Sequence, residues 1–369
     1  MYLSKLHVAN FRNFEDKLLS FSPDMTVIIG PNASGKTNIL EALYLLSTGK
    51  SFKAKIEEEM ITYGEEIGRV KALIKEGSDE VGEKEEKAVD TKLEAILTRG
   101  EISVGTTADK FKKTARKRLL INGIGKRLVD FSSVFKTVLF GPWDLDLVTE
   151  SPSIRRTFLD NVLSQVDREY RRASLSYNKG LRQRNRLLLR IREEGMPRSQ
   201  LIFWDRLLIK NGDYISGKRE EFIEFVNGRN SLSGHTFSIE YDKSAISEAR
   251  LEQYMNEEVA AATTLVGPHR DDFLIKISGH MGIKERDISR FGSRGEQRMG
   301  VLWIKLNELS FIEEKTGEKP TLLLDDIFSE LDHKHRDIVA DVAKNQQTII
   351  TTADPHYIEN LKKVEKIEL

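Results

Sequence analysis

One nine-residue stretch, residues 30–38, constrains this chain more than any other. It reads Gly-Pro-Asn-Ala-Ser-Gly-Lys-Thr-Asn and fits G-x-x-x-x-G-K-S/T, the pattern of a phosphate-binding loop. The apolar residues 25–29 before it predict a buried strand, and residues 39–46 after it predict a helix. In that setting the loop amides and the helix N-terminus converge on one spot that favours an anion. The alternative, a glycine turn that binds nothing, fits poorly between a strand and a helix.

The residues of this loop have separate expected roles. Backbone N–H groups cradle phosphates, Lys36 reaches the β- and γ-phosphates, and the Thr37 hydroxyl ligates Mg²⁺. We therefore expect a nucleotide site with Lys36 among its catalytic residues and Thr37 among its metal ligands. The residues expected to bind the nucleotide are Gly30, Pro31, Asn32, Ala33, Ser34, Gly35, Lys36, Thr37 and Asn38.

A second motif supplies the carboxylates that such a site needs. Three leucines at 322–324 predict a strand in the core of a sheet, and Asp325 and Asp326 follow directly. Ligands gather at the carboxyl edge of parallel strands. We expect Asp325 to hold Mg²⁺, directly or through water, and Asp326 to polarise the attacking water. The alternative is a strand that merely ends in surface acids.

The distance between the two motifs indicates an insertion. Asp325 follows Lys36 by 289 positions, which is long for a compact nucleotide-binding domain. Residues 151–153, Ser-Pro-Ser, predict a helix start, and apolar residues spaced by three or four continue the helix to Leu181. Gly195-Met196-Pro197 breaks it before a second long helix. At 1.5 Å per residue, helices of 30–40 residues would reach roughly 45–60 Å.

We therefore expect three parts. Residues 1–150 form the first half of an α/β head, residues 151–261 form a helical hairpin arm, and residues 262–369 form the second half of the head. The strongly acidic segment 76–90 is expected to be a solvated hairpin tip or a disordered loop. Residues 110–118, with six basic positions in nine, are either a solvated turn or a loop that contacts phosphate.

Composition narrows the class of protein. The 369 residues include 58 basic and 58 acidic ones, so any nucleic-acid footprint must be local. The lack of cysteine excludes a disulfide framework, Cys-ligated zinc and thiol catalysis. No apolar run approaches 18 residues, so we expect no membrane span and a cytoplasmic protein.

The arm carries the local positive charge. Residues 155–198 hold twelve Lys or Arg and five Asp or Glu. A basic helical stripe is typical of sequence-independent contact with a nucleic-acid backbone, for which arginine is well suited. The alternative is a solvated helix with ion pairs within the arm. The residues expected to bind DNA are Arg171, Arg172, Arg182, Arg184, Arg186 and Arg190.

A third motif lies between the loop and the acidic strand. Ser293 can cap the helix that follows it, and Gly295 allows a phosphate close to the backbone. This helix start could attract an anion or could simply be capped. Two further positions have open alternatives. Asp332 either caps a helix or lies in a subunit contact beside the nucleotide, and Thr352 either senses the γ-phosphate or is a plain strand residue.

Together these residues resemble the SMC-type branch of the ABC ATPases, and within it the RecF family of DNA replication and repair proteins. The resemblance covers essentially the whole chain. It implies an α/β fold with an ABC/SMC-type P-loop ATPase head, split by an insertion, and a helical hairpin arm lobe. It rests on residues 30–43, 10–14, 49–52, 151–160, 267–272 (Gly-Pro-His-Arg-Asp-Asp), 293–297, 325–326 and 329–332.

The resemblance implies an ATP-dependent homodimer. Each ATP would lie between the phosphate loop of one subunit and the Ser293–Gly295 helix of the other. The additional nucleotide-binding residues implied are Arg12, Ser293, Gly295, Glu296, Asp332 and Thr352. The family loads recombinase at gapped or junction DNA with the RecO and RecR proteins, so we expect these partners and a nucleoid-associated location.

Departures from the wider ABC pattern qualify this expectation. The resemblance implies a weak, DNA-dependent ATPase. Asp326 stands where many ABC proteins have Glu, and the shorter acid predicts slow turnover. Residues 140–144 contain no Gln for a metal contact, and Thr352 replaces the usual switch His. Glu296 replaces the more common Gln after Gly295.

Two other classes fit less well. An ABC transporter subunit would leave the basic hairpin without a purpose. A kinase or ligase would leave the Ser293–Gly295 helix unexplained, and the chain is too short for an SMC protein proper.

Overall fold

In the computed structural model, residues 1–76, 90–103, 111–278, 285–354, 356 and 364–369 are described. Most of the acidic segment 76–90, and residue 110 of the basic segment, lie outside them. The chain forms two compact units, one of residues 1–143 and 312–369 and the other of residues 144–311. Both η2 (Pro142–Leu145) and α10 (Arg294–Thr316) span a position at which the chain passes from one unit to the other.

A parallel sheet forms half of the first unit, and it draws its strands from both ends of the chain. The order is β10-β15-β16-β3-β17. These strands run Thr137–Phe140, Thr321–Asp325, Thr348–Thr352, Met25–Ile29 and Val364–Glu368. The strands predicted before the phosphate loop, before the two acids and near residue 350 are therefore confirmed. One sheet is completed across a long insertion, as the head of an ABC/SMC-type ATPase requires.

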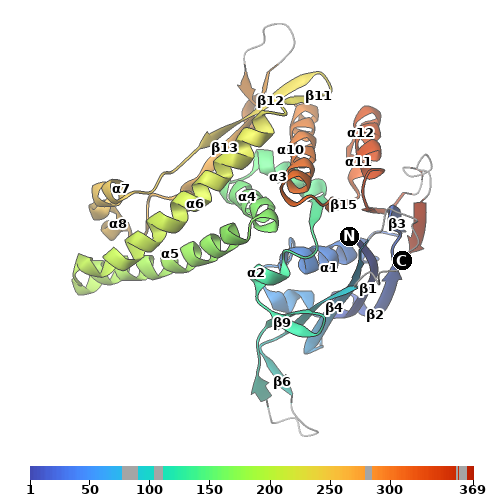
Figure 1. Ribbon diagram of the computed structural model, residues 1–369, viewed down its shortest axis with the longest axis horizontal. Helices are drawn as coiled ribbons and strands as arrows, with labels where there is room; N and C mark the ends of the chain where they lie inside the picture. The colour runs from blue at the N-terminus through green and yellow to red at the C-terminus, as the bar shows by residue number, and fades with distance from the viewer. Residues whose placement is uncertain (77–89, 104–110, 279–284, 355, 357–363) are drawn as a thin grey trace. The chain divides into compact units, whose positions relative to one another are not determined.

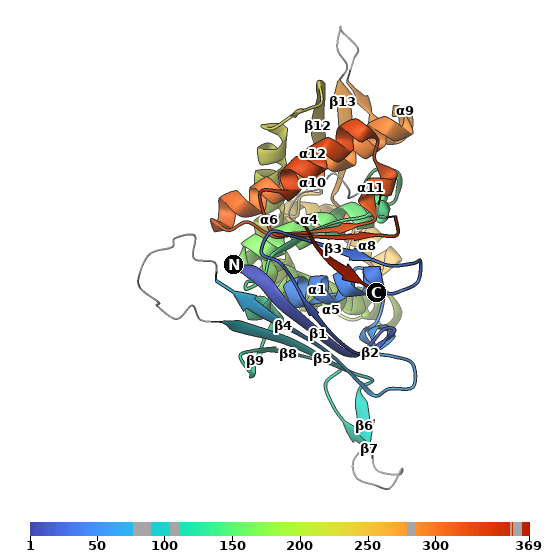
Figure 2. The same ribbon diagram turned by 90° about the vertical axis from the view of Figure 1, so that its right-hand side faces the viewer.

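The other sheet of this unit is antiparallel. Its order is β2-β1-β4-β5-β8-β9. Its strands run Phe14–Ser20, Tyr2–Phe11, Ile67–Lys75, Thr91–Thr98, Lys117–Ile121 and Ile124–Lys126. Figure 2 shows them between β9 on the left and β2 on the right. A separate pair, β6 (Glu101–Ser103) and β7 (Phe111–Lys113), extends after β5.

Helix α1 (Lys36–Thr48) lies between the two sheets and contacts strands of both (Figure 1). Residues 39–47 of this helix are all buried, as expected for a helix that is covered on every side. Its leucines share one core with Leu3 and Val8 of the antiparallel sheet and with Leu323 and Ile349 of the parallel sheet. Further helices among the described residues of this unit are η1 (Glu57–Met60), α2 (Leu128–Phe131), α11 (Ile327–Glu330) and α12 (His333–Ala343).

The second unit contains the helical arm. Helix α5 (Arg168–Glu194) packs along α6 (Ile202–Asn227), as Figure 1 shows. The short helix η3 (Arg198–Leu201) lies between them in the chain. Each of the two long helices is about 40 Å long at 1.5 Å per residue. The reach expected from the sequence was longer, because the first helix is in fact two. Asp167 ends α4 (Pro152–Val166) and caps α5 by accepting hydrogen bonds from the amides of residues 169 and 170.

A small antiparallel sheet and short helices complete this unit. The sheet order is β11-β12-β13-β14, with bounds Ser231–Leu232, His235–Asp242, Asp272–Ser278 and Arg286–Asp287. The short helices are α3 (Asp146–Thr149), α7 (Glu248–Gln253), α8 (Met255–Ala261), η4 (Pro268–Arg270) and α9 (Ile288–Phe291).

The compact units do not divide the chain where the sequence placed its boundaries. Residues 262–311 were assigned to the head, yet they lie in the same unit as the arm. Strand β13 pairs with β12, Trp303 stacks on Phe237, and Phe311 packs edge-on against Phe222. The predicted functional division at 150/151 and 261/262 stays a prediction. Among the described residues, no helix combines the length and the apolar character needed to cross a membrane.

Candidate nucleotide-binding site

The phosphate loop stands between β3 and α1, as predicted. Ala33 and Gly35 both have positive φ, 67° and 105°, which curls the backbone into a turn that only glycine adopts without strain at the second position. A Cβ on Gly35 would lie 2.6 Å from the Phe14 ring and 2.7 Å from the Asn13 amide. Asn13 supports the loop by donating to the Ser34 carbonyl at 3.1 Å.

The start of α1 is arranged to attract negative charge. Gly35 is its N-cap and provides no side chain to accept from the first helical amides. The positive end of the helix dipole is therefore not offset by a capping group. The Lys36 ammonium lies over the same loop, where it donates to the carbonyls of Gly30 (2.8 Å) and Pro31 (2.9 Å).

The predicted metal ligands lie side by side. The Thr37 hydroxyl donates to Asp325 Oδ2 at 2.7 Å, although 288 positions separate them. Asp325 Oδ1 accepts from the Thr351 hydroxyl at 2.5 Å, because β15 and β16 pair in a register that sets these two residues opposite each other. A hydroxyl and a carboxylate are the hard oxygen donors that Mg²⁺ prefers.

Asp326 has a strained backbone and a weakened acidity. Its φ of 50° lies in the left-handed region, which is unusual for a residue other than glycine. Its amide donates to the Thr351 carbonyl at 3.0 Å, and this bond fixes the turn after β15. Burial raises the pKa of Asp326 and the charge of Asp325 raises it further, against opposing contributions from Ser329 and Lys36. A carboxylate with a raised pKa is a stronger base.

Arg12 is held by a residue that the sequence reasoning missed. Its guanidinium makes a bidentate pair with Glu41, at 2.7 and 2.6 Å, and donates to the Glu59 carbonyl at 2.6 Å. Glu41 is fully buried on α1 and also accepts from the Ser51 hydroxyl. A lone acid inside the apolar run 39–46 was the available signal. Arg12 is thereby fixed on the helix that follows the phosphate loop, and a role for it at the nucleotide stays a prediction.

The Ser293 helix start is a reciprocal cap within the second unit. Ser293 Oγ accepts from the Glu296 amide at 3.3 Å, and Glu296 Oε2 accepts from the Ser293 amide at 2.7 Å. Glu296 Oε1 also pairs with Arg286 at 2.5 Å. The pKa of Glu296 is lowered, and the largest cause is the hydrogen bond that its carboxylate accepts from the Ser293 amide. The capping role expected of Ser293 is thus confirmed, while Ser293 and Gly295 themselves stay exposed.

Asp332 and Thr352 make local contacts. Asp332 is the N-cap of α12 and accepts from the His335 amide at 3.0 Å, which agrees with the capping alternative. Thr352 is buried at the end of β16, where its hydroxyl donates to the Asp354 carbonyl at 3.1 Å. Their roles at a nucleotide stay predictions.

Two of the arginines predicted to bind DNA are buried, which corrects that part of the prediction. Arg184 is fully buried and pairs with Asp205 and Glu258, each at 2.6 Å. It also donates to the Thr264 hydroxyl at 2.9 Å. Arg171 is 6% exposed. A guanidinium that is buried in this way does not face a DNA backbone.

The other four arginines are exposed on α5. Arg182, Arg186 and Arg190 follow one another at intervals of four and share one face of the helix. Arg190 pairs with Glu194 at 3.0 Å and Arg172 with Glu169 at 3.5 Å. Among the described residues, neither Arg182 nor Arg186 has an ion-pair partner. This exposed row, Arg172, Arg182, Arg186 and Arg190, is called the α5 arginines below.

Comparison with known proteins places this geometry in a family. The family model described as the RecF/RecN/SMC N terminal domain matches residues 2–369. The chain is 35% identical to the DNA replication and repair protein RecF of Herpetosiphon aurantiacus, over 99% of this chain and 97% of that protein. It is 33% identical to the RecF protein of Lachnoclostridium phytofermentans, over 100% of this chain and 97% of that protein.

Solved structures agree. The chain matches a structure of the recombination mediator protein RecF-ATPrS in the RecFOR pathway with a TM-score of 0.84 and 32% identity, over 99% of this chain and 96% of the other. A RecF-ATP structure of the same pathway matches with a TM-score of 0.82 and 32% identity, over 96% and 92% of the two chains. An Smc head matches at 16% identity with a TM-score of 0.53, covering 100% of this chain and 94% of the other, which is a likeness of fold alone.

Proposed function

Because the chain belongs to the RecF family of the RecF/RecN/SMC proteins, we propose that it is an ATP-binding and ATP-hydrolysing protein of DNA replication and recombinational repair. The single observation that carries the ATPase proposal is the 2.7 Å contact between Thr37 and Asp325. It joins the phosphate loop to the acidic strand at one edge of the parallel sheet, where nucleotide phosphates bind in open α/β folds.

The residues of the site have separate roles in ATP binding and hydrolysis. Loop amides and the Lys36 ammonium hold the β- and γ-phosphates. Thr37 and Asp325 hold Mg²⁺, which neutralises charge on the phosphate oxygens when it is bound. Asp326 orients and polarises the attacking water, and its raised pKa suits a base. Because an Asp side chain is one methylene shorter than Glu, turnover is slow.

The second half of the ATP site comes from another copy of the chain. Ser293 and Gly295 are exposed at the start of a 23-residue helix, and the Ser293 oxygen accepts within the cap, so its hydroxyl hydrogen is available to a phosphate. Two helix N-termini directed at one γ-phosphate bind ATP better than ADP. ATP therefore closes a homodimer, and hydrolysis opens it.

DNA is contacted without sequence preference by the α5 arginines, whose charge is exposed. The dimer assembles on gapped or junction DNA with RecO and RecR proteins and assists in loading recombinase on single strands, in the cytoplasm at the nucleoid. Residues 1–150 and 262–369 act as the ATPase head in this scheme, and residues 151–261 act as the arm lobe.

Light scattering after size-exclusion chromatography tests this function. The chain is run without nucleotide, with Mg-ADP and with Mg-ATP, each with and without a gapped duplex. The expected result is a dimer only with Mg-ATP, which also retains the duplex. Ser293→Arg should remain a monomer while still binding ATP, and Ser199→Arg, at an exposed position of η3, should behave like the unaltered chain. A monomer under every condition would overturn the proposal.

A further inference from the structure

The second unit contains a polar cavity that the proposed ATPase cycle does not use. Its volume is about 270 Å³, and it lies among α4, α5, α6 and η4. The lining residues that matter here are Arg156, Asp160, Ser174, Tyr177, Asn178 and His269. The cavity is at the small end of ligand sites, so it suits a compact ligand.

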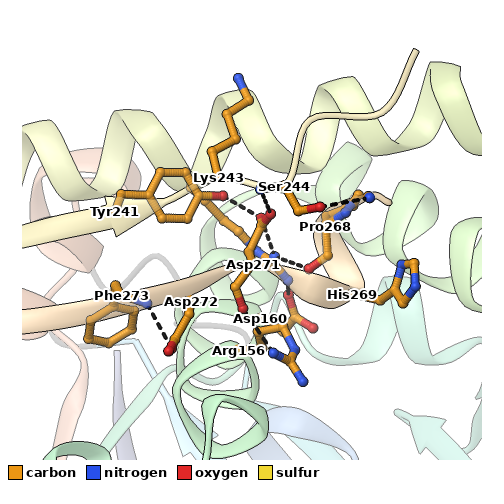
Figure 3. Close-up of polar contacts among 12 residues, drawn as sticks. Arg156, Asp160, Tyr241, Lys243, Ser244, Pro268, His269, Asp271, Asp272 and Phe273 are labelled. Atoms are coloured by element: carbon orange, nitrogen blue, oxygen red, sulfur yellow. Dashed lines mark hydrogen bonds and ion pairs between the residues drawn. The ribbon is translucent and has the colours of Figure 1, made fainter. Parts of the chain in front are cut away.

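One wall of the cavity is a closed ion-pair network built on the Gly267–Asp272 motif. The buried Arg219 donates to Asp271 Oδ2, Asp160 Oδ1 and the Pro268 carbonyl, at 2.7–2.8 Å. Tyr241 and the Ser244 amide also donate to the Asp271 carboxylate, as Figure 3 shows. The charge of Arg219 is thus neutralised by its two carboxylate partners, and this residue has a structural role.

Arg156 differs from Arg219 because its charge is not neutralised in this way. Its recorded hydrogen bond goes from Nη1 to the Asp271 backbone carbonyl at 2.8 Å, and the dashed line in Figure 3 joins these two groups. Among the described residues, no carboxylate is within ion-pair distance of its guanidinium. Burial, followed by the charge of Arg219, lowers the pKa of Arg156 against the opposing charges of Asp272, Asp271 and Asp160. An anion bound beside Arg156 would stabilise the charged guanidinium and so raise this pKa again.

The other lining groups offer further hydrogen bonds. His269 Nε2 lies 3.0 Å from the Thr264 carbonyl, which can only accept, so Nε2 carries the proton. His269 Nδ1 then accepts from the Tyr177 hydroxyl at 2.8 Å, which leaves the Tyr177 oxygen as an acceptor. The neutral ring is stable near pH 7, because burial lowers the pKa of His269 to about 4.

Donors and one more acceptor complete the set. The Asn178 amide donates once to Ser174 Oγ at 3.4 Å, so a second N–H of Asn178 and the Ser174 hydroxyl hydrogen remain available. Asp160 Oδ1 accepts from Tyr170 and Arg219, whereas its Oδ2 has no recorded partner among the described residues. The cavity therefore offers a cation without a carboxylate partner and small hydrogen-bond donors, together with two oxygens, Asp160 Oδ2 and the Tyr177 oxygen, that can accept from hydroxyl groups of a ligand.

We propose that this cavity binds a sugar phosphate, with Arg156, Ser174 and Asn178 on the phosphate and with Asp160 and Tyr177 on sugar hydroxyls. A bare anion would use only half of these groups, and a sugar without phosphate would leave Arg156 uncompensated. Two sources carry this chemistry, a free nucleotide or sugar phosphate and the terminal nucleotide of a nucleic acid. The assignment does not depend on the ATP site.

Calorimetric titration with ribose 5-phosphate tests the assignment. Every arm uses the full chain carrying Lys36→Ala, so that the phosphate loop does not contribute. We expect ribose 5-phosphate to bind more tightly than inorganic phosphate or ribose. Arg156→Gln should weaken the binding of ribose 5-phosphate at least tenfold, and Arg206→Gln, at an exposed arginine of α6 outside the cavity, should leave it unchanged. No binding of ribose 5-phosphate, or equal affinity in Arg156→Gln, would overturn the assignment.

A second variant guards against a failure of Arg156→Gln to fold. Asn178→Asp keeps the shape of an exposed side chain and adds a negative charge beside the phosphate, so it should weaken ribose 5-phosphate at least tenfold with an unchanged circular dichroism spectrum. Unaltered binding in this folded variant would also contradict the assignment.

A second experiment distinguishes a free sugar phosphate from a nucleic-acid terminus as the natural ligand. Fluorescence anisotropy measures the binding of a short duplex that carries or lacks a terminal phosphate. A preference for the phosphorylated end that is lost in Arg156→Gln assigns the cavity to a nucleic-acid terminus. Equal affinity for both duplexes, with ribose 5-phosphate binding still sensitive to Arg156→Gln, assigns it to a free sugar phosphate. If neither ligand responds to Arg156→Gln, the cavity is not a sugar-phosphate site.

Discussion

The hydroxyl of Thr37 and the carboxylate of Asp325 lie 2.7 Å apart, across 288 positions of sequence. This contact forms because β3 and β15 belong to one parallel sheet, with only β16 between them. Thr37 lies in the first turn of the helix after β3, and Asp325 is the last residue of β15. The insertion between them therefore leaves the two halves of the proposed phosphate and metal site at the same sheet edge.

Replacing Lys36 should remove ATP binding. Its ammonium is the only side-chain cation of residues 30–38, and it lies within 2.9 Å of two loop carbonyls. We expect Lys36→Ala to weaken ATP at least a hundredfold in equilibrium dialysis, or about 3 kcal/mol, and to abolish dimer formation. Lys50→Ala, at an exposed position just after α1, is the matched control. Dimers that still form with ATP in Lys36→Ala would contradict the site assignment.

Asp326→Asn should separate binding from hydrolysis. The amide keeps the shape of the side chain but cannot act as a base, so phosphate release should fall by about 10²-fold or more. ATP binding should persist and the dimer should accumulate, as measured by light scattering over hours. Asp24→Asn, an exposed acid that precedes β3, serves as the control. Turnover equal to that of the unaltered chain would remove Asp326 from its proposed role.

The same variant has an expected effect on stability. Since the pKa of Asp326 is raised in the folded state, the folded chain holds this proton more tightly than the unfolded chain does. The ionised group therefore costs stability at pH values above its folded pKa, and this cost fades as the pH falls from the folded pKa toward 3.8. Asp326→Asn should unfold at a higher temperature than the unaltered chain at pH 7, and calorimetric scans at decreasing pH should show the difference shrinking.

Arg184 and Arg186 should have opposite consequences although they are two residues apart. Arg184→Gln leaves Glu258 and Asp205 without their cation, and losing one partner of a buried pair costs about 3–5 kcal/mol. Arg186→Gln should change stability by less than about 0.5 kcal/mol. It should instead weaken DNA binding and reduce the slope of log K against log salt by about 1.

Urea denaturation and salt-dependent anisotropy measure the two effects on the same pair of variants. A stable Arg184→Gln chain that has lost DNA affinity would reverse the assignment of these two arginines.

His269 should make the second unit sensitive to mild acid. Burial lowers its pKa from 6.5 to about 4, so the unfolded state gains a proton near pH 6 that the folded state does not hold. Stability should therefore fall by about 2 kcal/mol between pH 7 and pH 5 from this group alone. Urea midpoints at the two pH values should show a smaller loss in His269→Gln than in the unaltered chain. His7→Gln, on the antiparallel sheet of the first unit, is the control.

Sequence alone predicted the parts of the fold that local patterns specify. The loop, α1, β3 and β15 follow from glycine spacing and apolar runs, and the assignment of both Thr37 and Asp325 to one metal site follows from the rule for parallel strands. The break at Asp167 was missed, since the apolar spacing continues through it while its carboxylate caps a new helix.

The error at Arg184 has a different cause. Arg184 occupies the buried face of α5 together with Tyr177 and Leu188. The helical spacing of these three residues in the sequence was the available signal that Arg184 lies on the buried face. Its partners Asp205, Glu258 and Thr264 come from three other segments, so only the fold brings them together. Glu41 is a similar case, because its pairing with Arg12 depends on how β1 meets α1.

The proposed division of each ATP site between two copies of the chain is tested most directly by mixing two inactive variants. Lys36→Ala retains an intact Ser293, and Ser293→Arg retains an intact phosphate loop. If each site takes its loop from one copy and its Ser293 from the other, the mixed dimer contains one complete site. Sedimentation with Mg-ATP should then show a dimer, and phosphate release should resume, only in the mixture. A mixture that stays monomeric and inactive like its two components, with both variants folded, would contradict the account.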